Sequence, residues 1–332
     1  MKILIDSFNN VIQNPAGGVQ IRIGNYVKFF NKTTTEHTVK LYNKWEDKLE
    51  DYDVLHVFKA TIDSYNLCAL AKKKGLKIVI SAVIPPENSI KIKLLLNMPS
   101  SCQRLLKKMF DLSDYIVCQT KKEADFITKI YKVSNSKIHV IPNGVDLKFK
   151  DCNPDIFRER YNIKGEFALQ VGRFDSNKNQ LSVIRAVKNT DIQMVFIGGE
   201  DPNEKEYYEK CEIEATDNVK LLGWIENGGD MLASAYNAAK VTILPSYSEI
   251  FGNSLMEGGM AGCNLIVTQA LPIEEWGLEE KCLSIDPRKV DDIKKVIIKS
   301  MSMDRDKSVT NIIEQNFSWP RVVNKYIDLY KD

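Results

Sequence analysis

The stretch FALQVGRFDSNKN, residues 167–179, decides how this chain folds. Its first part, Phe167–Val171, is a short apolar run typical of a buried strand, and a glycine follows it. Arg173 and Lys178 then lie on the loop that leads to the next helical pattern. In doubly wound sheets ligands bind beyond the carboxyl ends of the strands, so two cations placed there could bind a diphosphate. The alternative is that both are solvated loop charges.

The same alternation of apolar strands and helical patterns extends along the chain. The expected strands are Lys2–Asp6, Val39–Tyr42, Val54–Phe58, Lys77–Val83, Tyr115–Cys118, Lys137–Ile141, Phe167–Val171, Gln193–Ile197, Val219–Leu222, Val241–Leu244, Asn264–Thr268 and Cys282–Ile285. The expected helices include Gly18–Phe30, Ser64–Lys74, Ser101–Phe110, Lys122–Tyr131 and Trp319–Tyr330. Strands that alternate with helices predict parallel sheets with crossover helices, and therefore an α/β fold.

A change of pattern around residues 142–165 predicts a passage between two domains. Pro142-Asn-Gly144, Pro154 and a charged stretch interrupt the alternation there. We expect an N-terminal domain over 1–150 and a C-terminal domain over 151–316, both doubly wound. The last segment, 317–332, is amphipathic and is expected to pack back on the first domain. The strand-end loops of the two domains would face each other across a cleft.

Length, composition and charge agree with this organisation. The 332 residues, 44% hydrophobic and 27% charged, correspond to about two globular domains, which excludes a disordered tail, a collagen or a mini-protein. The net charge of +2 hides an asymmetry, because residues 1–150 carry +10 and residues 151–332 carry −8. The basic half could meet an anionic partner, or the charges could be unevenly distributed solvated faces.

Signals for export, disulfides or metal binding are not found in the sequence. No apolar run reaches about 18 residues, and the N-terminal run ends at Asp6, so we expect a cytoplasmic protein. The seven cysteines are scattered and never spaced as C-x-x-C, which is typical of reduced thiols. The three histidines do not cluster either, so no Cys/His metal site is expected.

Three further strand-end loops are candidates for ligand binding. Residues 14–20 contain Gly17 and Gly18 before a helix, which would let the backbone approach a ligand, or else form a flexible turn. Residues 221–225 could border a flat base or be a plain turn. In residues 244–257, the amides of Gly252, Asn253 and Ser254 would begin a helix and form an anion site.

Two glutamates accompany this last loop. Glu257 could act locally, since Ser254 and Glu257 fit a capping box. A capping box would not explain Glu249, which lies eight residues earlier on the loop itself.

Taken together, these residues resemble the family-four retaining glycosyltransferases, which have the GT-B fold. The matching motifs are Gly17-Gly-Val19, Ile141-Pro-Asn-Gly-Val-Asp146, Val171-Gly-Arg173 with Lys178-Asn179, Gly198-Gly199, Gly223, Pro245-Ser246, and Glu249 with Glu257 as E-x7-E. Each glycine motif is common by itself. Their ordered combination along most of the chain is specific.

The resemblance implies a role for each site residue. Arg173 and Lys178, beside Gly172, would bind the donor diphosphate, and Glu257 would bind the ribose hydroxyls. Glu249 would lie near the donor sugar, and we group it with Arg173 and Lys178 as catalytic. The remaining donor-binding positions would be Gly17, Gly18, the backbone near Ile225, and the amides of Phe251, Gly252, Asn253 and Ser254.

The resemblance also implies a reaction. A sugar would pass with retention from a nucleotide sugar, with UDP-sugars favoured over GDP-sugars, to a lipid-linked or oligosaccharide acceptor in surface polysaccharide synthesis. Neither a metal nor a cofactor would be required, and we treat the D-x-D string at Asp51–Asp53 as a chance match because it precedes a strand. The alternatives are a GT-B epimerase or hydrolase, or a non-catalytic partner subunit that binds sugar nucleotides.

Two features of the first domain bear on the donor sugar and the acceptor. The family usually has a histidine after the strand that matches Lys77–Val83, whereas this chain reads SAVIPPE, so Ser81 or Glu87 substitutes or the sugar pocket differs. Residues 91–110 are basic and amphipathic, so they could lie on an anionic membrane on the inner face, or pack their apolar side on the sheet. Aromatic residues do not alternate with the basic ones, so nucleic-acid binding is not expected.

Overall fold

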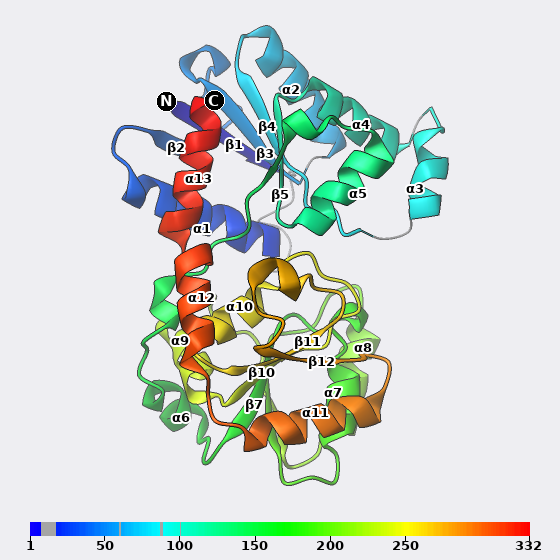
Figure 1. The fold of residues 1–332 in the computed structure, drawn as a ribbon, viewed down its shortest axis with the longest axis vertical. Coiled ribbons are helices and arrows are strands. Elements are labelled where there is room, and N and C mark those ends of the chain that lie inside the picture. Colours follow the sequence, from blue (N-terminus) through cyan, green and yellow to red (C-terminus); the bar gives the residue numbers. More distant parts are fainter. Residues whose placement is uncertain (8–17, 60, 87–88, 100) are drawn as a thin grey trace. The chain divides into compact units, whose positions relative to one another are not determined.

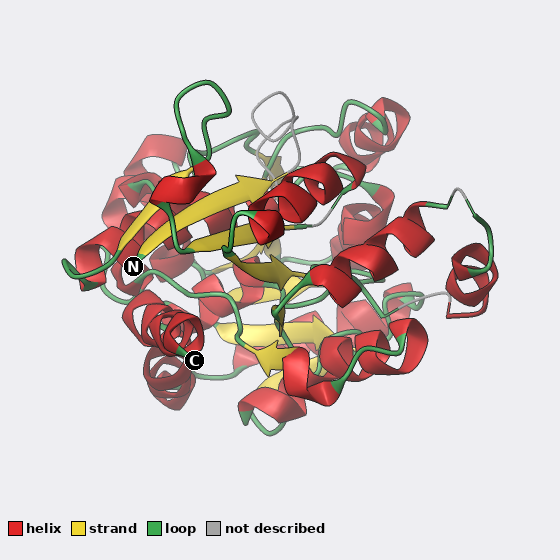
Figure 2. Cartoon of the chain, turned by 90° about the horizontal axis from the view of Figure 1, so that it is seen from above, coloured by secondary structure: helices red, strands yellow, loops and turns green. Residues whose placement is uncertain are grey.

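The computed structural model describes residues 1–7, 18–59, 61–86, 89–99 and 101–332. It divides into two compact units, which we name unit 1 (Met1–Gly144 with Trp319–Asp332) and unit 2 (Val145–Ser318). Each unit is built on a six-stranded parallel sheet (Figure 1). Helices lie on both sides of the strands (Figure 2), so the predicted α/β class is confirmed.

The sheet of unit 1 has the strand order β2-β1-β3-β4-β5-β6. Its strands are β1 Lys2–Ser7, β2 Thr38–Leu41, β3 Val54–Phe58, β4 Lys77–Ser81, β5 Tyr115–Cys118 and β6 Ile138–Val140. Its helices are α1 Gly18–Thr33, α2 Ile62–Lys73, α3 Ser89–Leu96, α4 Cys102–Leu112, α5 Lys121–Tyr131 and α13 Trp319–Lys331. The expected strands all occur in the described part of this unit; Val54–Phe58 and Tyr115–Cys118 match at both ends, and the ends of the others are shifted by at most two residues.

Helix α13 joins the N-terminal unit although it is the last helix of the chain. It packs alongside α1, as the red and blue helices in Figure 1 show. Trp319, Tyr326 and Tyr330 are buried in one core cluster with residues of β1, β3 and α1. The Tyr330 hydroxyl lies 2.6 Å from the Tyr26 hydroxyl and 2.6 Å from Nδ1 of His56. A polar network inside an apolar core therefore fixes the register of α13.

The sheet of unit 2 has the order β12-β11-β10-β7-β8-β9. Its strands are β7 Phe167–Val171, β8 Gln193–Ile197, β9 Val219–Leu221, β10 Val241–Leu244, β11 Asn264–Thr268 and β12 Cys282–Ile285. Its helices are α6 Asp155–Tyr161, α7 Gln180–Val187, α8 Lys205–Glu214, α9 Asp230–Ala238, α10 Asn253–Met260, α11 Val290–Ser302 and α12 Lys307–Phe317. Separate apolar clusters cover the two faces of this sheet.

The strand order of unit 2 positions the candidate site. From β7 the chain winds outward through β8 and β9, and it then returns to β10 on the other side of β7. The winding direction therefore reverses between β7 and β10, and doubly wound sheets bind their ligands in a crevice at such a switch point. The loops after these two strands carry Arg173, Lys178 and Glu249.

Candidate functional site

The loops that follow β7 and β10 are joined by side-chain to backbone hydrogen bonds. The Asn177 side chain donates to the Ser248 carbonyl (3.0 Å) and accepts from the Ser248 amide (2.9 Å). The Tyr247 amide donates to the Asn177 carbonyl at 2.9 Å. The sequence placed these loops at strand ends, and the structure brings them into contact at the switch point.

Lys178 and Glu249 form an ion pair across these two loops. Lys178 ends a short 3-10 turn, Ser176–Lys178, whose N-cap is Asp175; the Asp175 carboxylate accepts the Lys178 amide at 2.9 Å. Glu249 is largely buried, and Lys178 is partly accessible. The pair places one cation and one carboxylate together at the crevice, where a diphosphate and a sugar could meet them.

Arg173 lies beside this pair and is flanked by two carboxylates. Its Nε is 3.0 Å from the Asp201 carboxylate, and its Nη2 is 3.4 Å from that of Asp175. The arginine side chain is 36% exposed, whereas both aspartates are almost fully buried. A guanidinium has five N–H donors, so these two ion pairs leave other donors for a ligand, and the buried Nε has no hydrogen-bond partner among the described residues.

Glycines allow the backbone to pack closely behind Arg173. Gly198 has φ +147°, and a Cβ added there would lie 2.0 Å from the carbonyl oxygen of Gly172. A Cβ on Gly199 would lie 2.1 Å from Nε1 of Trp224. The Gly198 amide donates to the Gly223 carbonyl at 2.8 Å. The loops after β7, β8 and β9 thus form one close-packed floor that no side chain could enter.

The N-terminus of α10 forms the opposite wall. Gly252 is the N-cap residue in the left-handed conformation (φ +69°), and no side chain caps the helix. The amides of Leu255 and Met256 bond the Gly252 carbonyl, so the first turn is aligned. Asn253 and Ser254 begin the helix. Their amides are the first of a helix that has the dipole orientation to attract an anion.

Glu257 has no capping role. The helix begins at Asn253 instead of after Ser254, so the capping-box alternative is wrong. Instead, Tyr236 on α9 donates its hydroxyl to the Glu257 carboxylate at 2.8 Å. Burial raises the pKa of Glu257 to about 7, and the charge of Asp146 acts in the same direction. The described residues supply no cation to this buried carboxylate within 4 Å.

The family is established by comparison with known proteins. The sequence model described as "Glycosyl transferases group 1" matches residues 154–319, half of the chain. The model described as "Glycosyltransferase Family 4" matches residues 9–149. The chain belongs to the group 1 glycosyltransferases. Its resemblance to family-four glycosyltransferases is confirmed.

Curated relatives of this glycosyltransferase match over part of their length. The mannosylfructose-phosphate synthase of Agrobacterium fabrum is 25% identical over 174 residues, 47% of this chain and 37% of that protein. The Escherichia coli UDP-Gal:alpha-D-GlcNAc-diphosphoundecaprenol alpha-1,3-galactosyltransferase is 29% identical over 166 residues, 46% of this chain and 42% of that protein. The matched segment therefore spans less than half the length of these relatives.

Solved structures confirm the GT-B fold of this glycosyltransferase. Sucrose-phosphate synthase from Thermosynechococcus elongatus superposes with a TM-score of 0.78 at 17% identity, covering 99% of this chain and 98% of that one. HepE from Anabaena, solved in complex with UDP and glucose, superposes with a TM-score of 0.77 at 15% identity, covering 100% and 99%.

The other predicted donor positions of the glycosyltransferase fall into two groups. Phe251 is a core residue whose ring packs edge-on against Trp276, so only its backbone faces the crevice. Ile225 packs partly on the same core, next to the half-exposed Trp224. Gly18 begins α1, whereas Gly17 lies outside the described residues.

Of the two residues predicted to replace the family histidine, Ser81 and Glu87, the structure describes Ser81. Ser81 is buried at the end of β4, and its hydroxyl lies 2.9 Å from Nε2 of the buried His56. Burial lowers the pKa of His56. Glu87 lies outside the described residues. His56, on the neighbouring strand β3, therefore contacts Ser81, the last residue of β4, and the family histidine is expected just after this strand.

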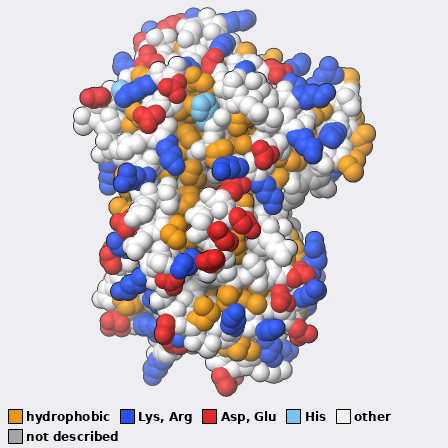
Figure 3. All heavy atoms as spheres, in the orientation of Figure 1, with side chains coloured by type: hydrophobic (Ala, Val, Ile, Leu, Met, Phe, Trp, Pro, Cys, Tyr) orange, Lys and Arg blue, Asp and Glu red, His pale blue; other side chains and the backbone are white. Residues whose placement is uncertain are grey.

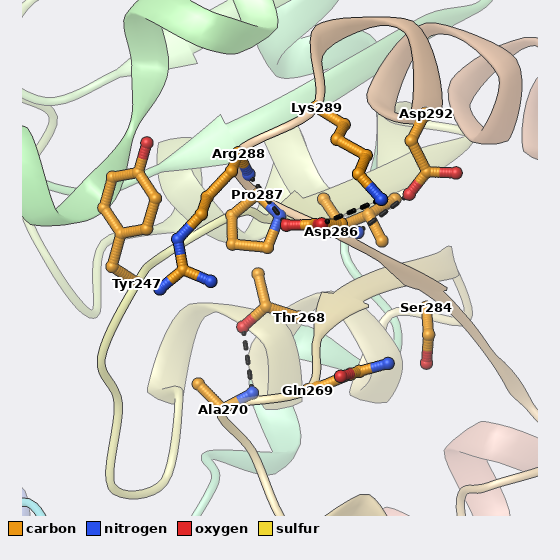
Figure 4. A pocket seen from close by; sticks show the side chains of 11 residues that line it. Tyr247, Thr268, Gln269, Ala270, Ser284, Asp286, Pro287, Arg288, Lys289 and Asp292 are labelled. Carbon is orange, nitrogen blue, oxygen red and sulfur yellow. Dashed lines mark hydrogen bonds and ion pairs between the residues drawn. The ribbon is translucent and has the colours of Figure 1, made fainter. Parts of the chain in front are cut away.

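A polar pocket of about 390 Å³ adjoins the Lys178 loop and was not predicted from sequence (Figure 4). It is lined by Tyr247 and by residues after β11 and β12, among them Gln269 and Arg288. Asn179 donates to the carbonyl of Pro287 in its wall at 2.7 Å and accepts from the Tyr247 hydroxyl at 3.3 Å. The pocket wall therefore supports the residue that follows Lys178.

The described residues contain neither a cluster of metal ligands nor a membrane-spanning helix. No group of three His, Cys, Asp or Glu side chains within them could hold a metal ion. Asp53 of the D-x-D string accepts the Lys2 amide at 2.7 Å. No helix among the same residues has the length and apolarity needed to span a bilayer.

Proposed function

We propose that this chain transfers a sugar from a nucleoside-diphosphate sugar to an acceptor with retention of configuration and without a metal ion. The observation that carries the proposal is the convergence of Arg173, Lys178 and the α10 amides at one switch point, with Glu249 and the buried Glu257 beside them. Cations and helix amides suit a diphosphate, and carboxylates suit hydroxyl groups.

The buried carboxylate of Glu257 suits a ribose. It accepts one hydroxyl from Tyr236, and burial makes its charged form costly. Hydrogen bonds from two ribose hydroxyls would supply the stabilisation that the unliganded carboxylate lacks. The backbone near Ile225 would then border the base, and Gly172 would allow close approach to the phosphates.

Charge development explains the chemistry. Cleavage of the sugar–phosphate bond leaves an oxocarbenium-like sugar and a diphosphate, and Arg173, Lys178 and the amides of Phe251–Ser254 would stabilise this leaving group. We propose that no covalent sugar–enzyme intermediate forms. We therefore propose that the acceptor attacks from the leaving-group face and gives its proton to a phosphate oxygen, with Glu249 close to the donor sugar.

We propose UDP-sugars as donors and a lipid-linked or oligosaccharide acceptor, used in surface polysaccharide synthesis in the cytoplasm. HepE has been solved with UDP and with UDP-glucose, and the E. coli relative is named for UDP-Gal and a diphosphoundecaprenol acceptor. These names support a nucleotide-sugar donor and a lipid-linked acceptor for this chain.

A thermal-shift screen of UDP-, GDP- and ADP-sugars tests the proposal, because a ligand stabilises the folded state according to its affinity. We expect UDP-sugars to raise the melting temperature and Arg173→Ala to abolish the shift. Transfer by the wild type would separate a transferase from an epimerase, a hydrolase or a non-catalytic subunit. If no nucleotide sugar shifts the melting temperature, the proposal is wrong.

A membrane contact through residues 91–110 is a second proposal, and the packing of the two helices in this region favours α3 over α4 as the contact. Helix α4 buries Met109 and Phe110 in the core of unit 1, as the packing alternative expected, and Lys107 bonds Asp111 at 2.7 Å. Helix α3 has no buried residue, and Ile90 and Leu94 are 77% and 65% exposed. Basic and apolar side chains lie together over α3 in Figure 3. We therefore assign the contact to α3.

Sedimentation with vesicles that contain anionic phosphatidylglycerol tests this contact. Binding should decrease with salt and should be reduced by Ile90→Glu. The matched control is Ile213→Glu on α8, because Ile213 is equally exposed, at 82%. Equal binding by the two variants would exclude α3 as the contact.

A further inference from the structure

The acidic residue Asp201 is held against Arg173 by the backbone. The loops after β7 and β8 pair with each other, because the Phe174 amide bonds the Gly199 carbonyl at 2.9 Å and the Asp201 amide bonds the Phe174 carbonyl at 3.1 Å. This pairing places the Asp201 side chain directly beside Arg173. Main-chain hydrogen bonds therefore fix the position of the Asp201 backbone.

Both oxygens of the Asp201 carboxylate are engaged. Oδ1 accepts from the Asn203 amide at 2.9 Å and from its side-chain nitrogen at 3.1 Å. Oδ2 is 3.0 Å from Nε of Arg173. Asp201 is only 6% exposed, so this ion pair is little screened by solvent. The contact at Nε is an ion pair and not a hydrogen bond, because Nε has no hydrogen-bond partner among the described residues, whereas Nη2 donates to the Asp175 carboxylate at 3.4 Å.

The ionised groups around the two cations do not make the crevice positive. Three carboxylates, those of Asp175, Asp201 and Glu249, lie within 4 Å of Arg173 or Lys178. Two cations and three carboxylates give this cluster a net charge of −1. A diphosphate would therefore enter a site that holds it by directed donors but repels it by net charge.

We propose, on the basis of the function proposed above, that Asp201 has two effects on the reaction. Its side chain, held by Asn203 and by main-chain bonds, positions Arg173, and its charge keeps the affinity for the nucleoside diphosphate product low enough for release. Asp201 is thus a positioning residue that also tunes product release.

Two substitutions separate the effects. Asp201→Asn keeps the volume of the side chain beside Arg173 but removes the charge, whereas Asp201→Ala removes both. We expect Asp201→Asn to bind UDP about tenfold more tightly by titration calorimetry, the factor expected from one charge roughly 8 Å from a phosphate. We expect its kcat to fall together with its KM for the donor, because release slows. Asp201→Ala should instead lower kcat/KM, since Arg173 loses its orientation.

The matched control is Glu214→Gln, which removes one negative charge from the same unit. Glu214 ends α8, and its exposed carboxylate pairs with Arg185. This variant should bind UDP as the wild type does. Equal UDP affinity in Asp201→Asn and the wild type would overturn the inference alone, whereas a wild type that binds neither UDP nor GDP would overturn the proposed function and the inference with it.

A measurement on the wild type does not depend on whether the variants fold. Salt screens both attraction and repulsion, so a site of net charge −1 should bind UDP equally well or better as salt rises. A steep loss of affinity with salt would show a net positive site and contradict the inference.

Discussion

Replacing Glu257 by glutamine should make the ligand-free protein more stable above pH 7. The carboxylate is buried, it accepts a hydrogen bond from the Tyr236 hydroxyl, and burial raises its pKa to about 7 from an ordinary value of 4.5. Between these two values the folded state holds a proton that the unfolded chain has lost. Stability therefore falls as the pH rises through this window.

The size of the effect follows from the pKa. A rise of about 2.5 units at about 1.36 kcal/mol per unit corresponds to about 3 kcal/mol of stability that is lost above pH 7. Glutamine carries no charge and keeps an oxygen for the Tyr236 hydroxyl, so it avoids this loss. For a unit of this size, 3 kcal/mol corresponds to about 6–12 °C in melting temperature.

The assay is calorimetric unfolding of the ligand-free protein at about pH 5 and about pH 8, on either side of the window. The gain of Glu257→Gln should be present at the higher pH and absent at the lower one, where the wild-type carboxyl is already neutral. If Glu257 binds the ribose, the same variant should also lose most of its affinity for UDP.

Glu123 on α5 provides the control. Its pKa is also raised by burial to about 7, but its two oxygens accept the backbone amides of Ile84 (2.7 Å) and Gln119 (2.6 Å). In Glu123→Gln an N–H group would face an amide N–H, so this variant should be destabilised at both pH values. The reasoning would be refuted if Glu257→Gln gained the same stability at both pH values. It would also be refuted if the melting temperatures of Glu257→Gln and Glu123→Gln changed in the same direction by the same amount.

Three further outcomes are expected. Arg173→Ala and Lys178→Ala should each lower kcat by about a hundred- to a thousandfold, because each removes a donor to the leaving group, while the circular dichroism spectrum stays unchanged; full activity in both would mean that the site is misplaced. Gly198→Ala should lower the melting temperature, since its Cβ would lie 2.0 Å from a backbone oxygen, whereas Gly24→Ala, which has open space, should not. Excess chelator should leave transfer unchanged, and strong inhibition would point to a metal-dependent reaction.

The sequence predicted the two sheets well because parallel strands are buried on both faces. Such strands appear as short apolar runs, and the ends of β7 and β10 were predicted at the residues where the structure has them. The loops after them could be placed at one sheet edge for the same reason. Which loops touch each other depends on strand order, and periodicity does not report strand order.

The errors and omissions have a common physical origin in tertiary contacts. The apolar side of α4 was a candidate for the membrane, yet Met109 and Phe110 pack in the core, because periodicity shows a face but not what covers it. The partner of Glu257 is Tyr236, which lies on another helix and belongs to no motif. Asp201 gave a usable signal, an acidic residue just after the glycines at the end of β8, but its contact with Arg173 required knowing that β7 and β8 are neighbours.

The return of α13 to unit 1 has a consequence for the order in which the chain matures on the ribosome. Unit 2 is continuous, so all of its residues are made before Trp319 is added. Unit 1 cannot complete its core until α13 has been made, and until then the residues of β1, β3 and α1 that pack against α13 are exposed to solvent. Gly144 and Trp319 then meet so closely that a Cβ on the glycine would lie 2.2 Å from the indole. The unit that is translated first is thus the unit that is completed last, because its core cluster lacks the residues of α13 until the whole chain has been made.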